Sequence, residues 1–178
     1  MEKSEIRNLA SVLGKMKTMK RNGWLKRGIK DAESTAEHSY SLAMLVLLLT
    51  PQGMDQLKCF KLALVHDLPE ILCGDFVPGE FTPEEKGKLE MDAMSRIAAN
   101  IGSEELMVLF DEFLAQETPE AKLVQALDQL DNVFTACFYE DKLHKNMMKD
   151  FWPTTYPLIQ QLPENVRNQL LGILMALS

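Results

Sequence analysis

Helix-start signals recur along this chain, and no segment shows the alternating polar and apolar pattern of a β-strand or hairpin. Residues 34–37, Ser-Thr-Ala-Glu, have the form of a capping box, with Ser at the N-cap and Glu three residues later. Residues 82–85, Thr-Pro-Glu-Glu, repeat that form with proline at the first helical position. We therefore predict an all-α fold, a bundle of about six to eight helices. Helices are expected to begin at residues 34 and 82, and others to cover residues 5–19, 55–72, 103–115, 118–139 and 163–177.

The length of 178 residues predicts one compact domain over residues 1–178. Its motif-bearing core is expected at about 15–140 and its C-terminal helices at 141–178, with residues 74–79 and 150–153 as ordinary connections. A chain of this size buries roughly two-thirds of the surface that it exposes when unfolded, so it needs neither a disulfide nor a structural metal for stability. Metal ligands in this chain are therefore expected to be functional.

The charge is uneven along the chain. The chain has 19 Lys and Arg residues and 26 Asp and Glu residues, so its net charge is −7. This negative charge argues against a long nucleic acid as a partner. Residues 15–30 nevertheless hold seven basic side chains and no acidic one. This segment is explained either as a solvated basic loop or as a local site for a small anion.

Three cysteines, Cys59, Cys73 and Cys137, lie far apart and form no CxxC pair. We predict reduced, mostly buried thiols, which favour a cytoplasmic location. The acidic, amphipathic start of the chain does not resemble a signal or transit peptide. The most apolar run, residues 42–49, is far shorter than the roughly 18 residues that a membrane span requires. We therefore expect no membrane partner.

Histidine and aspartate residues in apolar helices are the candidates for chemistry. His38 and His66 lie among apolar neighbours, and Asp67 directly follows His66. A buried imidazole or carboxylate is costly unless it is paired or binds a metal. The helix over residues 118–139 adds Asp128 and Asp131, and the helical wheel does not choose between these two. Taken singly, each histidine is also explained as a hydrogen-bonded core residue.

Two imidazoles and two or three carboxylates from separate helices can meet around one divalent cation. A mixed nitrogen and oxygen donor set without thiolates suits an octahedral manganese, cobalt, iron or magnesium ion better than a closed structural zinc site. We expect cobalt or manganese, with magnesium, iron or zinc as alternatives. Four protein ligands leave positions for water and substrate. Such a cation lowers the pKa of bound water and polarises a phosphoryl oxygen.

The order His38, His66-Asp67, Asp128 resembles the H…HD…D signature of the HD-domain metal-dependent phosphohydrolases, and more closely their 5′-deoxynucleotidase branch. The resemblance implies that these four residues bind one divalent metal, and it selects Asp128 over Asp131. It rests on RNGW at 21–24, ESTAEHS at 33–39, LALVHDLPE at 62–70, GD at 74–75 and AKLVQALDQ at 121–129.

The resemblance also implies two catalytic acids, Glu70 at the metal-bound water and Asp75 near the scissile phosphate. Spacing supports Glu70 independently, because on a continuing helix it shares a side with His66 and Asp67. Pro69 is expected to kink that helix and to free the carbonyl group of residue 65.

For the substrate, the resemblance implies Arg21 at the 5′-phosphate and Trp24 beside the sugar or base, with Asp75 as a further contact. Lys20 and Arg27 are alternatives for the phosphate, and Trp24 is also explained as a core aromatic residue. The planar guanidinium of arginine matches phosphate oxygens in pairs.

The function that follows is metal-dependent hydrolysis of (deoxy)nucleoside 5′-monophosphates to nucleoside and phosphate, in a homodimer as the resemblance implies. No histidine lies between Asp67 and Asp128, which argues against the di-iron and two-metal branches of the superfamily, and His144 is predicted to be a surface residue. Two alternatives remain open. One is an HD-type phosphohydrolase for another small phosphorylated metabolite. The other is a catalytically idle helical module that binds a nucleotide or a partner, with 11 methionines as an adaptable contact surface.

Overall fold

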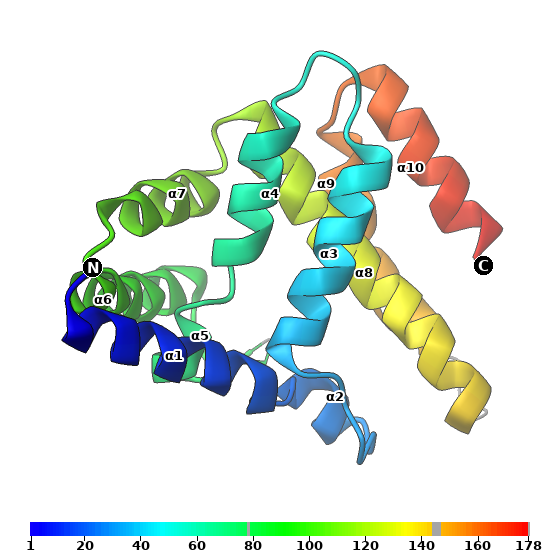
Figure 1. Ribbon diagram of the computed structural model, residues 1–178. Coiled ribbons are helices and arrows are strands. Elements are labelled where there is room, and N and C mark those ends of the chain that lie inside the picture. The colour runs from blue at the N-terminus through cyan, green and yellow to red at the C-terminus, as the bar shows by residue number, and fades with distance from the viewer. Residues whose placement is uncertain (78, 144–146, 178) are drawn as a thin grey trace. The chain divides into compact units, whose positions relative to one another are not determined.

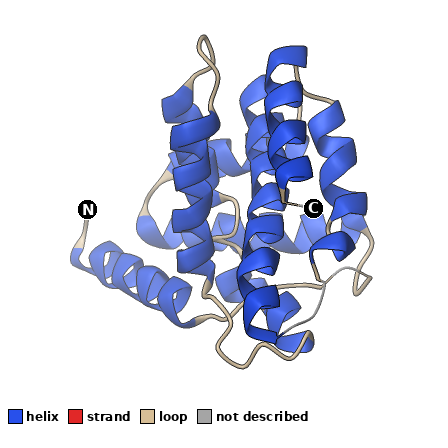
Figure 2. Ribbon diagram, turned by 90° about the vertical axis from the view of Figure 1, so that its right-hand side faces the viewer, coloured by secondary structure: helices blue, strands red, loops and turns tan. Residues whose placement is uncertain are grey.

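The computed structural model describes residues 1–77, 79–143 and 147–177, and every regular element in them is helical (Figures 1 and 2). No strand occurs in these residues, which contain one isolated β-bridge, between Lys20 and Ser34. The all-α prediction is confirmed. The elements are α1 (Lys3–Thr18), α2 (Asn22–Lys26), α3 (Thr35–Leu49), α4 (Gln56–Val65), α5 (Glu70–Cys73), α6 (Pro83–Ile101), α7 (Glu104–Ala115), α8 (Pro119–Leu143), η1 (Met148–Asp150), α9 (Trp152–Gln160) and α10 (Glu164–Ala176).

Local capping signals locate the helix starts well. Thr82 accepts a hydrogen bond from the Glu85 amide, and the Glu85 carboxylate accepts one from the Thr82 amide at 2.9 Å, so both halves of the capping box form before α6. Before α3, Glu37 accepts from the Ser34 amide at 2.6 Å, and the Glu37 amide donates to the Ser34 hydroxyl at 3.2 Å. Ser34 and Thr82 therefore cap these helices as predicted, and α3 and α6 begin at the next residue, Thr35 and Pro83.

The prediction of one helix over residues 55–72 is wrong, because α4 ends at Val65 and α5 begins at Glu70. Pro69 lacks the N–H group that would continue the helix, and it serves as the N-cap of α5. The Val65 carbonyl is not freed as expected, since it accepts a hydrogen bond from the Leu68 amide at 3.1 Å. The chain therefore turns at 66–69 instead of kinking.

The prediction of an ordinary connection at residues 150–153 is also wrong. The 3-10 helix η1 ends at Asp150, and α9 begins at Trp152 with Pro153 in its first turn. Proline is favoured in that position because its missing N–H would have no intrahelical partner there. The short α2 likewise lies where no helix was predicted. The surface prediction for His144 falls outside the described residues.

The chain divides into two compact units, and each is described by itself. Unit 1 comprises Met1–Tyr40 and Leu64–Ala115, and unit 2 comprises Ser41–Ala63 and Gln116–Ser178. In unit 1, α6 packs against α1, α5 and α7, and α1 runs alongside α6 in Figure 1. Its core contains Val12, Ile97 and Ile101, against which further side chains pack, namely Leu9, Leu68, Ile71 and Leu106. The turn after α4 thus places its apolar side chains on the α1–α6 core.

Unit 2 is built on α8, which packs against η1 and α9, while α9 packs against α10. Three leucines that recur at helical spacing on α8 are fully buried, namely Leu123, Leu127 and Leu130. At its first turn, Glu120 accepts hydrogen bonds from the Lys58 ammonium at 2.8 Å and from the Asp55 amide at 3.3 Å. These bonds join the start of α4 to the start of α8.

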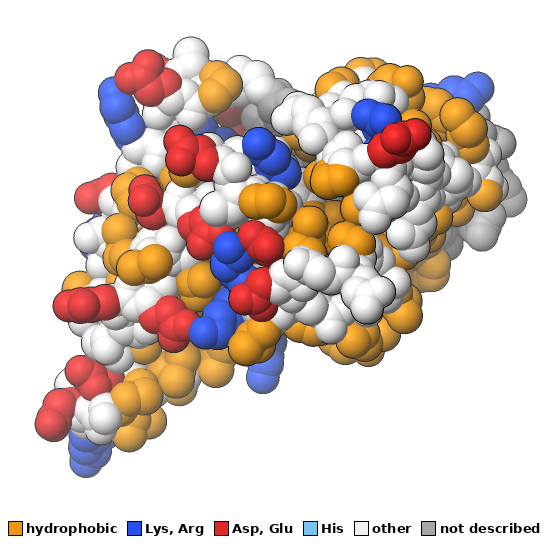
Figure 3. Space-filling view, turned by 90° about the horizontal axis from the view of Figure 1, so that it is seen from above, with side chains coloured by type: hydrophobic (Ala, Val, Ile, Leu, Met, Phe, Trp, Pro, Cys, Tyr) orange, Lys and Arg blue, Asp and Glu red, His pale blue; other side chains and the backbone are white. Residues whose placement is uncertain are grey.

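Acidic and basic side chains are interspersed with exposed hydrophobic ones on the face shown in Figure 3. Within the described residues, no helix combines the length and the apolar character that crossing a membrane requires. The three cysteines form no disulfide within the described residues, and Cys59 is buried while the other two are half-buried.

Candidate metal centre and substrate site

Three of the predicted metal ligands meet in unit 1. The Nε2 atoms of His38 and His66 lie 3.2 Å apart, and Asp67 Oδ2 lies 3.2 Å from His66 Nε2 and 3.6 Å from His38 Nε2. Both histidines are buried, and one potential ligand atom of each of the three residues lies within 4.8 Å of the others. Two nitrogen lone pairs and a carboxylate oxygen that face a common point form a donor set suited to a divalent cation.

The start of α3 and the turn after α4 position these side chains. The His38 amide donates to the Ser34 carbonyl at 3.0 Å, so the histidine stands at the end of the first helical turn set by the capping box. His66 and Asp67 follow the last residue of α4, where the helix has ended. The His66 ring also meets the edge of Phe113 from α7, with ring centroids 5.6 Å apart. This contact with Phe113 therefore helps to restrain the imidazole.

Arg21 is joined to this cluster through Asp67. Its Nη1 atom lies 2.9 Å from Asp67 Oδ2, the same oxygen that faces the two imidazoles. Burial alone would raise the pKa of Asp67, but the imidazole of His66, the guanidinium of Arg21 and the imidazole of His38 together hold that pKa well below its ordinary value. Asp67 is thus an anion in this site.

The fourth predicted ligand, Asp128, lies on α8 in unit 2, where it is half-buried. Its Oδ2 atom accepts a hydrogen bond from Gln129 Nε2 at 3.1 Å, and its backbone carbonyl accepts one from Asn132 Nδ2 at 3.2 Å. The neighbouring Asp131 is buried. Ligation by Asp128 remains a prediction.

Both predicted catalytic acids lie in unit 1 beside Asp67. Glu70 is the first residue of α5 and is only 6% exposed, and its Oε2 atom has no hydrogen-bond partner in residues 1–77, 79–143 and 147–177. Burial raises the pKa of Glu70 well above its ordinary value, and the negative charges of Asp67 and Asp75 raise it further. An uncompensated buried carboxyl group is typical of a functional acid or base.

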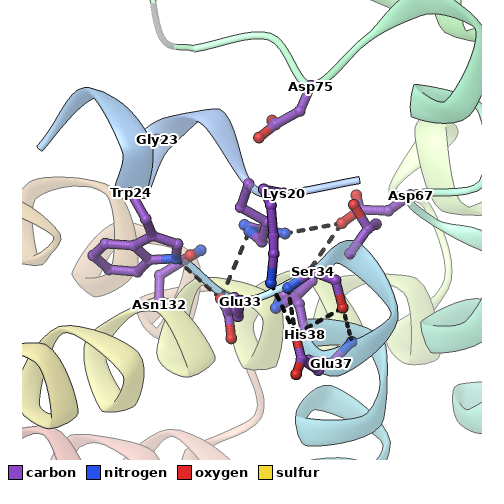
Figure 4. A network of polar contacts seen from close by, with 12 residues as sticks. Lys20, Gly23, Trp24, Glu33, Ser34, Glu37, His38, Asp67, Asp75 and Asn132 are labelled. Atoms are coloured by element: carbon purple, nitrogen blue, oxygen red, sulfur yellow. Dashed lines mark hydrogen bonds and ion pairs between the residues drawn. The ribbon is translucent and has the colours of Figure 1, made fainter. Parts of the chain in front are cut away.

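Asp75 follows α5 and is held by Asn22. The Asn22 amide donates to Asp75 Oδ2 at 2.5 Å, and Asn22 Nδ2 donates to the Asp75 carbonyl at 2.8 Å. Burial raises the pKa of Asp75, although the Arg21 guanidinium and the Asn22 amide oppose that rise. Figure 4 shows the Asp75 side chain directed toward the polar network around Glu33.

Trp24, predicted beside the sugar or base, is 2% exposed. Its indole Nε1 donates a hydrogen bond to Glu33 Oε1 at 3.0 Å, as Figure 4 shows. The guanidinium carbon of Arg27 lies 5.8 Å from the centroid of the Trp24 ring. Stacking of a nucleotide on Trp24 remains a prediction, since it needs a ring face that the substrate can reach.

The sequence profile of the HD domain matches residues 13–173. The chain belongs to the HD domain family. Among the solved structures, this HD-domain chain is similar to a protein from Pyrococcus horikoshii OT3, with 29% identity, a TM-score of 0.82 and coverage of 97% of this chain and 99% of the other. A protein from Magnetospirillum magnetotacticum, 22% identical with a TM-score of 0.74, has the same fold over 98% of this chain and 96% of its own.

Curated members of the HD domain family extend this similarity. The human protein named 5′-deoxynucleotidase HDDC2 is 34% identical over 161 residues, which cover 85% of this chain and 79% of the human one. A protein of the same name from Danio rerio is 36% identical over 149 residues, covering 81% of this chain and 74% of its own. A 5′-deoxynucleotidase from Schizosaccharomyces pombe is 34% identical over 79% of this chain and 76% of its own.

Sequence reasoning missed several polar residues that surround the centre of this HD-domain chain. Glu33 contacts both Trp24 and Arg21, and Asn22 fastens Asp75. The sequence did hold a signal for each residue. Asn22 lies inside the basic segment, within residues 21–24, and Glu33 directly precedes the capping box, within residues 33–39.

A second missed pair lies on α6, and the positive charge of one member, Lys86, lowers the pKa of Glu70. Lys86 Nζ lies 3.2 Å from the buried Glu90 Oε1. Burial raises the pKa of Glu90 more than its partner Lys86 lowers it. The i to i+4 spacing of these two residues was visible in the sequence, but nothing there indicated that the pair faces the acids of the site.

Proposed function

We propose that this protein is a metal-dependent phosphomonoesterase that hydrolyses deoxynucleoside 5′-monophosphates to nucleoside and phosphate. The observation that carries the proposal is the convergence of the His38, His66 and Asp67 ligand atoms within 4.8 Å of one another. A guanidinium and two acids with raised pKa values adjoin them. The relatives named 5′-deoxynucleotidase support this substrate class.

The donor set in unit 1 fits a divalent metal. Two Nε2 atoms 3.2 Å apart can share only one proton, and Asp67 Oδ2 adds a negative oxygen on the same side. We propose His38, His66, Asp67 and Asp128 as the ligands, and cobalt or manganese as the ion in preference to magnesium, iron or zinc. When bound, such an ion polarises a phosphoryl oxygen and acidifies a water molecule.

We assign the phosphate contact to Arg21. Its guanidinium adjoins the proposed metal centre through Asp67, and its planar fork suits the non-bridging oxygens of a phosphate. The alternatives are engaged elsewhere, because Lys20 Nζ lies 3.9 Å from Glu37 Oε2 and Arg27 Nη1 donates to the Gly23 carbonyl at 3.1 Å. Neutralising phosphoryl charge is the dominant contribution that proteins make to phosphoryl transfer.

The two acids account for the protons of the reaction. The oxygen of a water molecule forms a bond to phosphorus while the bond between phosphorus and O5′ breaks. We propose that the Glu70 carboxylate takes the proton from the attacking water, and that Asp75 gives a proton to the departing O5′. Raised pKa values suit both tasks, since Glu70 becomes a stronger base and Asp75 keeps its proton to higher pH.

We further propose that Trp24 and Asp75 contribute to nucleotide binding near the sugar. Trp24 is anchored by its bond to Glu33, and Asp75 by its bonds to Asn22, so both side chains are preorganised before substrate arrives. The protein is also proposed to be cytoplasmic, to act as a homodimer and to form a single domain over residues 1–178.

The experiment is phosphate release by the purified protein from a panel of deoxy- and ribonucleoside 5′-monophosphates, each tested with cobalt, manganese, magnesium, iron and zinc. We expect turnover with cobalt or manganese and with deoxynucleotides. Activity on another small phosphorylated compound but on no nucleotide would replace the proposed substrate. Nucleotide binding without phosphate release under any metal would identify a binding module instead.

Variants test the assignment of roles. Asp67→Ala is expected to lose both metal and turnover, whereas Glu70→Ala and Asp75→Ala keep the metal and lose turnover by at least about a hundredfold. Metal content by elemental analysis and phosphate release are measured on the same samples. Glu84→Ala is the matched control, because Glu84 is exposed and pairs only locally, with Lys88 at 2.8 Å. Full metal occupancy in Asp67→Ala would refute the ligand assignment.

A further inference from the structure

One carboxylate in unit 1 contacts both side chains that we assign to the nucleotide. Glu33 Oε1 accepts the indole hydrogen of Trp24 at 3.0 Å and lies 3.8 Å from Arg21 Nε. The Glu33 side chain is only 13% exposed. A carboxylate at this depth is costly unless it is paired, so these contacts are what stabilise its charge there.

Backbone hydrogen bonds also join the segment that carries Glu33 to the segment that carries Arg21. The Arg21 amide donates to the Glu33 carbonyl at 3.1 Å, and the Thr35 amide donates to the Met19 carbonyl at 3.0 Å. These bonds flank the β-bridge between Lys20 and Ser34 and hold the basic segment against the start of α3. The position of Glu33 relative to Arg21 is therefore set by the backbone and does not depend on the side-chain contact.

Arg21 is held at two places on its guanidinium. Its Nε atom faces Glu33, and its Nη1 atom lies 2.9 Å from Asp67 Oδ2. Asp67 Oδ2 also faces the two imidazoles, so it is shared between the arginine and the proposed ligand set. A guanidinium has five N–H donors in one plane, so a partner at Nε orients the Nη edge for a phosphate.

From this arrangement we propose that Glu33 is a positioning residue for substrate, which holds the guanidinium of Arg21 and the indole of Trp24 in place for the phosphate and the sugar of one nucleotide. Glu33 does not touch the reacting atoms and acts through these two side chains. The inference rests on the proposed function. Preorganised contacts lower the cost of ordering side chains on binding, so losing Glu33 is expected to weaken binding more than it slows the chemical step.

The test is a double-mutant cycle. Glu33→Gln keeps the shape and an acceptor for the indole but removes the negative charge, and Arg21→Lys keeps a cation but removes the Nε atom. We expect Glu33→Gln alone to raise KM for a deoxynucleoside 5′-monophosphate about tenfold, as for the loss of one charge from a close ion pair, with kcat changed by less than about threefold. The inhibition constant of inorganic phosphate should rise in parallel.

In the Arg21→Lys background, Glu33→Gln should raise KM further by less than about twofold, because the contact that it removes is already missing. An equal effect of Glu33→Gln in both backgrounds would show that Glu33 does not act through Arg21 and would overturn the inference. If Glu33→Gln does not fold, Glu33→Asp, which retains the charge with a shorter reach, is placed in the same cycle with the same criterion.

Glu37→Gln is the matched control for disturbing the start of α3. Glu37 accepts hydrogen bonds from the Ser34 amide at 2.6 Å and from the Ser34 hydroxyl at 2.8 Å, and it lies 3.9 Å from Lys20 Nζ. It should lower the thermal midpoint and leave KM within about twofold of wild type. A wild-type protein that hydrolyses no nucleotide would overturn both the proposed function and this inference. An active wild type with an unchanged KM in Glu33→Gln would overturn the inference alone.

Discussion

Replacing Glu70 by Gln is expected to stabilise the metal-free protein at neutral pH. The Glu70 side chain is 6% exposed, and no donor within the described residues bonds its Oε2 atom. Burial and the charges of Asp67 and Asp75 raise its pKa well above the ordinary value. Ionising this carboxyl group in the folded state is therefore unfavourable, and Gln cannot ionise.

The sign of the effect follows from proton linkage. At pH values below the unfolded-state pKa of Glu70, its carboxyl group is protonated in both the folded and the unfolded state, so its ionisation does not lower the free energy of unfolding. As pH rises through that value toward the raised folded-state pKa, the unfolded chain ionises first and the folded protein loses stability. Leaving a buried ionisable group without a hydrogen-bond partner costs about 1–3 kcal/mol. We expect Glu70→Gln to recover about 2 kcal/mol at pH 8, which corresponds to a rise of roughly 4–8 °C in Tm for a chain of this size.

Urea denaturation in the presence of a chelator, at pH 8 and at pH 4, measures this difference. The stabilisation by Glu70→Gln should be present at pH 8 and absent at pH 4. Glu84→Gln is the control, because Glu84 is exposed and should change stability by less than about 0.5 kcal/mol at either pH. A Glu70→Gln variant that is less stable than wild type at pH 8 would refute the reasoning, since it would mean that the ionised carboxylate has favourable partners.

Two further perturbations test the fold. Gly102 caps the C-terminal end of α6 with a φ of 73°, and a Cβ atom at this position would meet the Glu5 carboxylate. Gly102→Ala should therefore lower the free energy of unfolding, measured by urea denaturation, by about 1–2 kcal/mol. Gly14→Ala, within α1 and with open space around it, should instead be neutral or stabilising. Burial raises the pKa of Cys59 to about 12 and that of Cys73 to about 11. Iodoacetamide at pH 8 should therefore modify each thiol at least about a hundredfold more slowly than it modifies a free thiol. Rapid labelling of either cysteine, detected by mass spectrometry, would contradict this expectation.

The helix starts were predictable because their signals are local. The reciprocal bonds of Thr82 with Glu85 and of Ser34 with Glu37 join residues three apart, so the residues that cause them are visible in a short window. The stripe of Leu123, Leu127 and Leu130 was predictable for the same reason, since a helix imposes its own period.

The break after Val65 was not predictable, because a proline can kink a helix or end it. Here it is ended, and Leu68 and Ile71 on either side of Pro69 pack against the core formed by α1 and α6. That contact joins residues more than 25 positions apart in the sequence, which local propensity does not encode. The same limit applies to Glu33, whose partners Trp24 and Arg21 are known only once the segments around the β-bridge are paired.

The basic segment has a different electrostatic role in the structure from the one that its composition suggests. Lys20 lies 3.9 Å from Glu37, and Lys26 donates to Glu80 at 2.6 Å, so these cations are paired with acids on neighbouring segments. Arg21 alone of these three cations reaches Asp67. We therefore expect Lys20 and Lys26 to add little to the attraction for a phosphate, since exposed ion pairs largely cancel at a distance and are screened by salt.

The acids of the candidate metal centre, in contrast, place negative charge where we propose that the phosphate binds. The negative charges of Asp67 and Asp75 raise the pKa of Glu70, and the charge of Asp67 raises the pKa of Asp75. A substrate phosphate would bring more negative charge to the same place. One guanidinium cannot offset that much negative charge where burial limits solvation. We therefore expect a bound divalent cation to be needed for phosphate binding at the proposed site, so that phosphate affinity measured with and without metal differs far more than the salt dependence of either measurement.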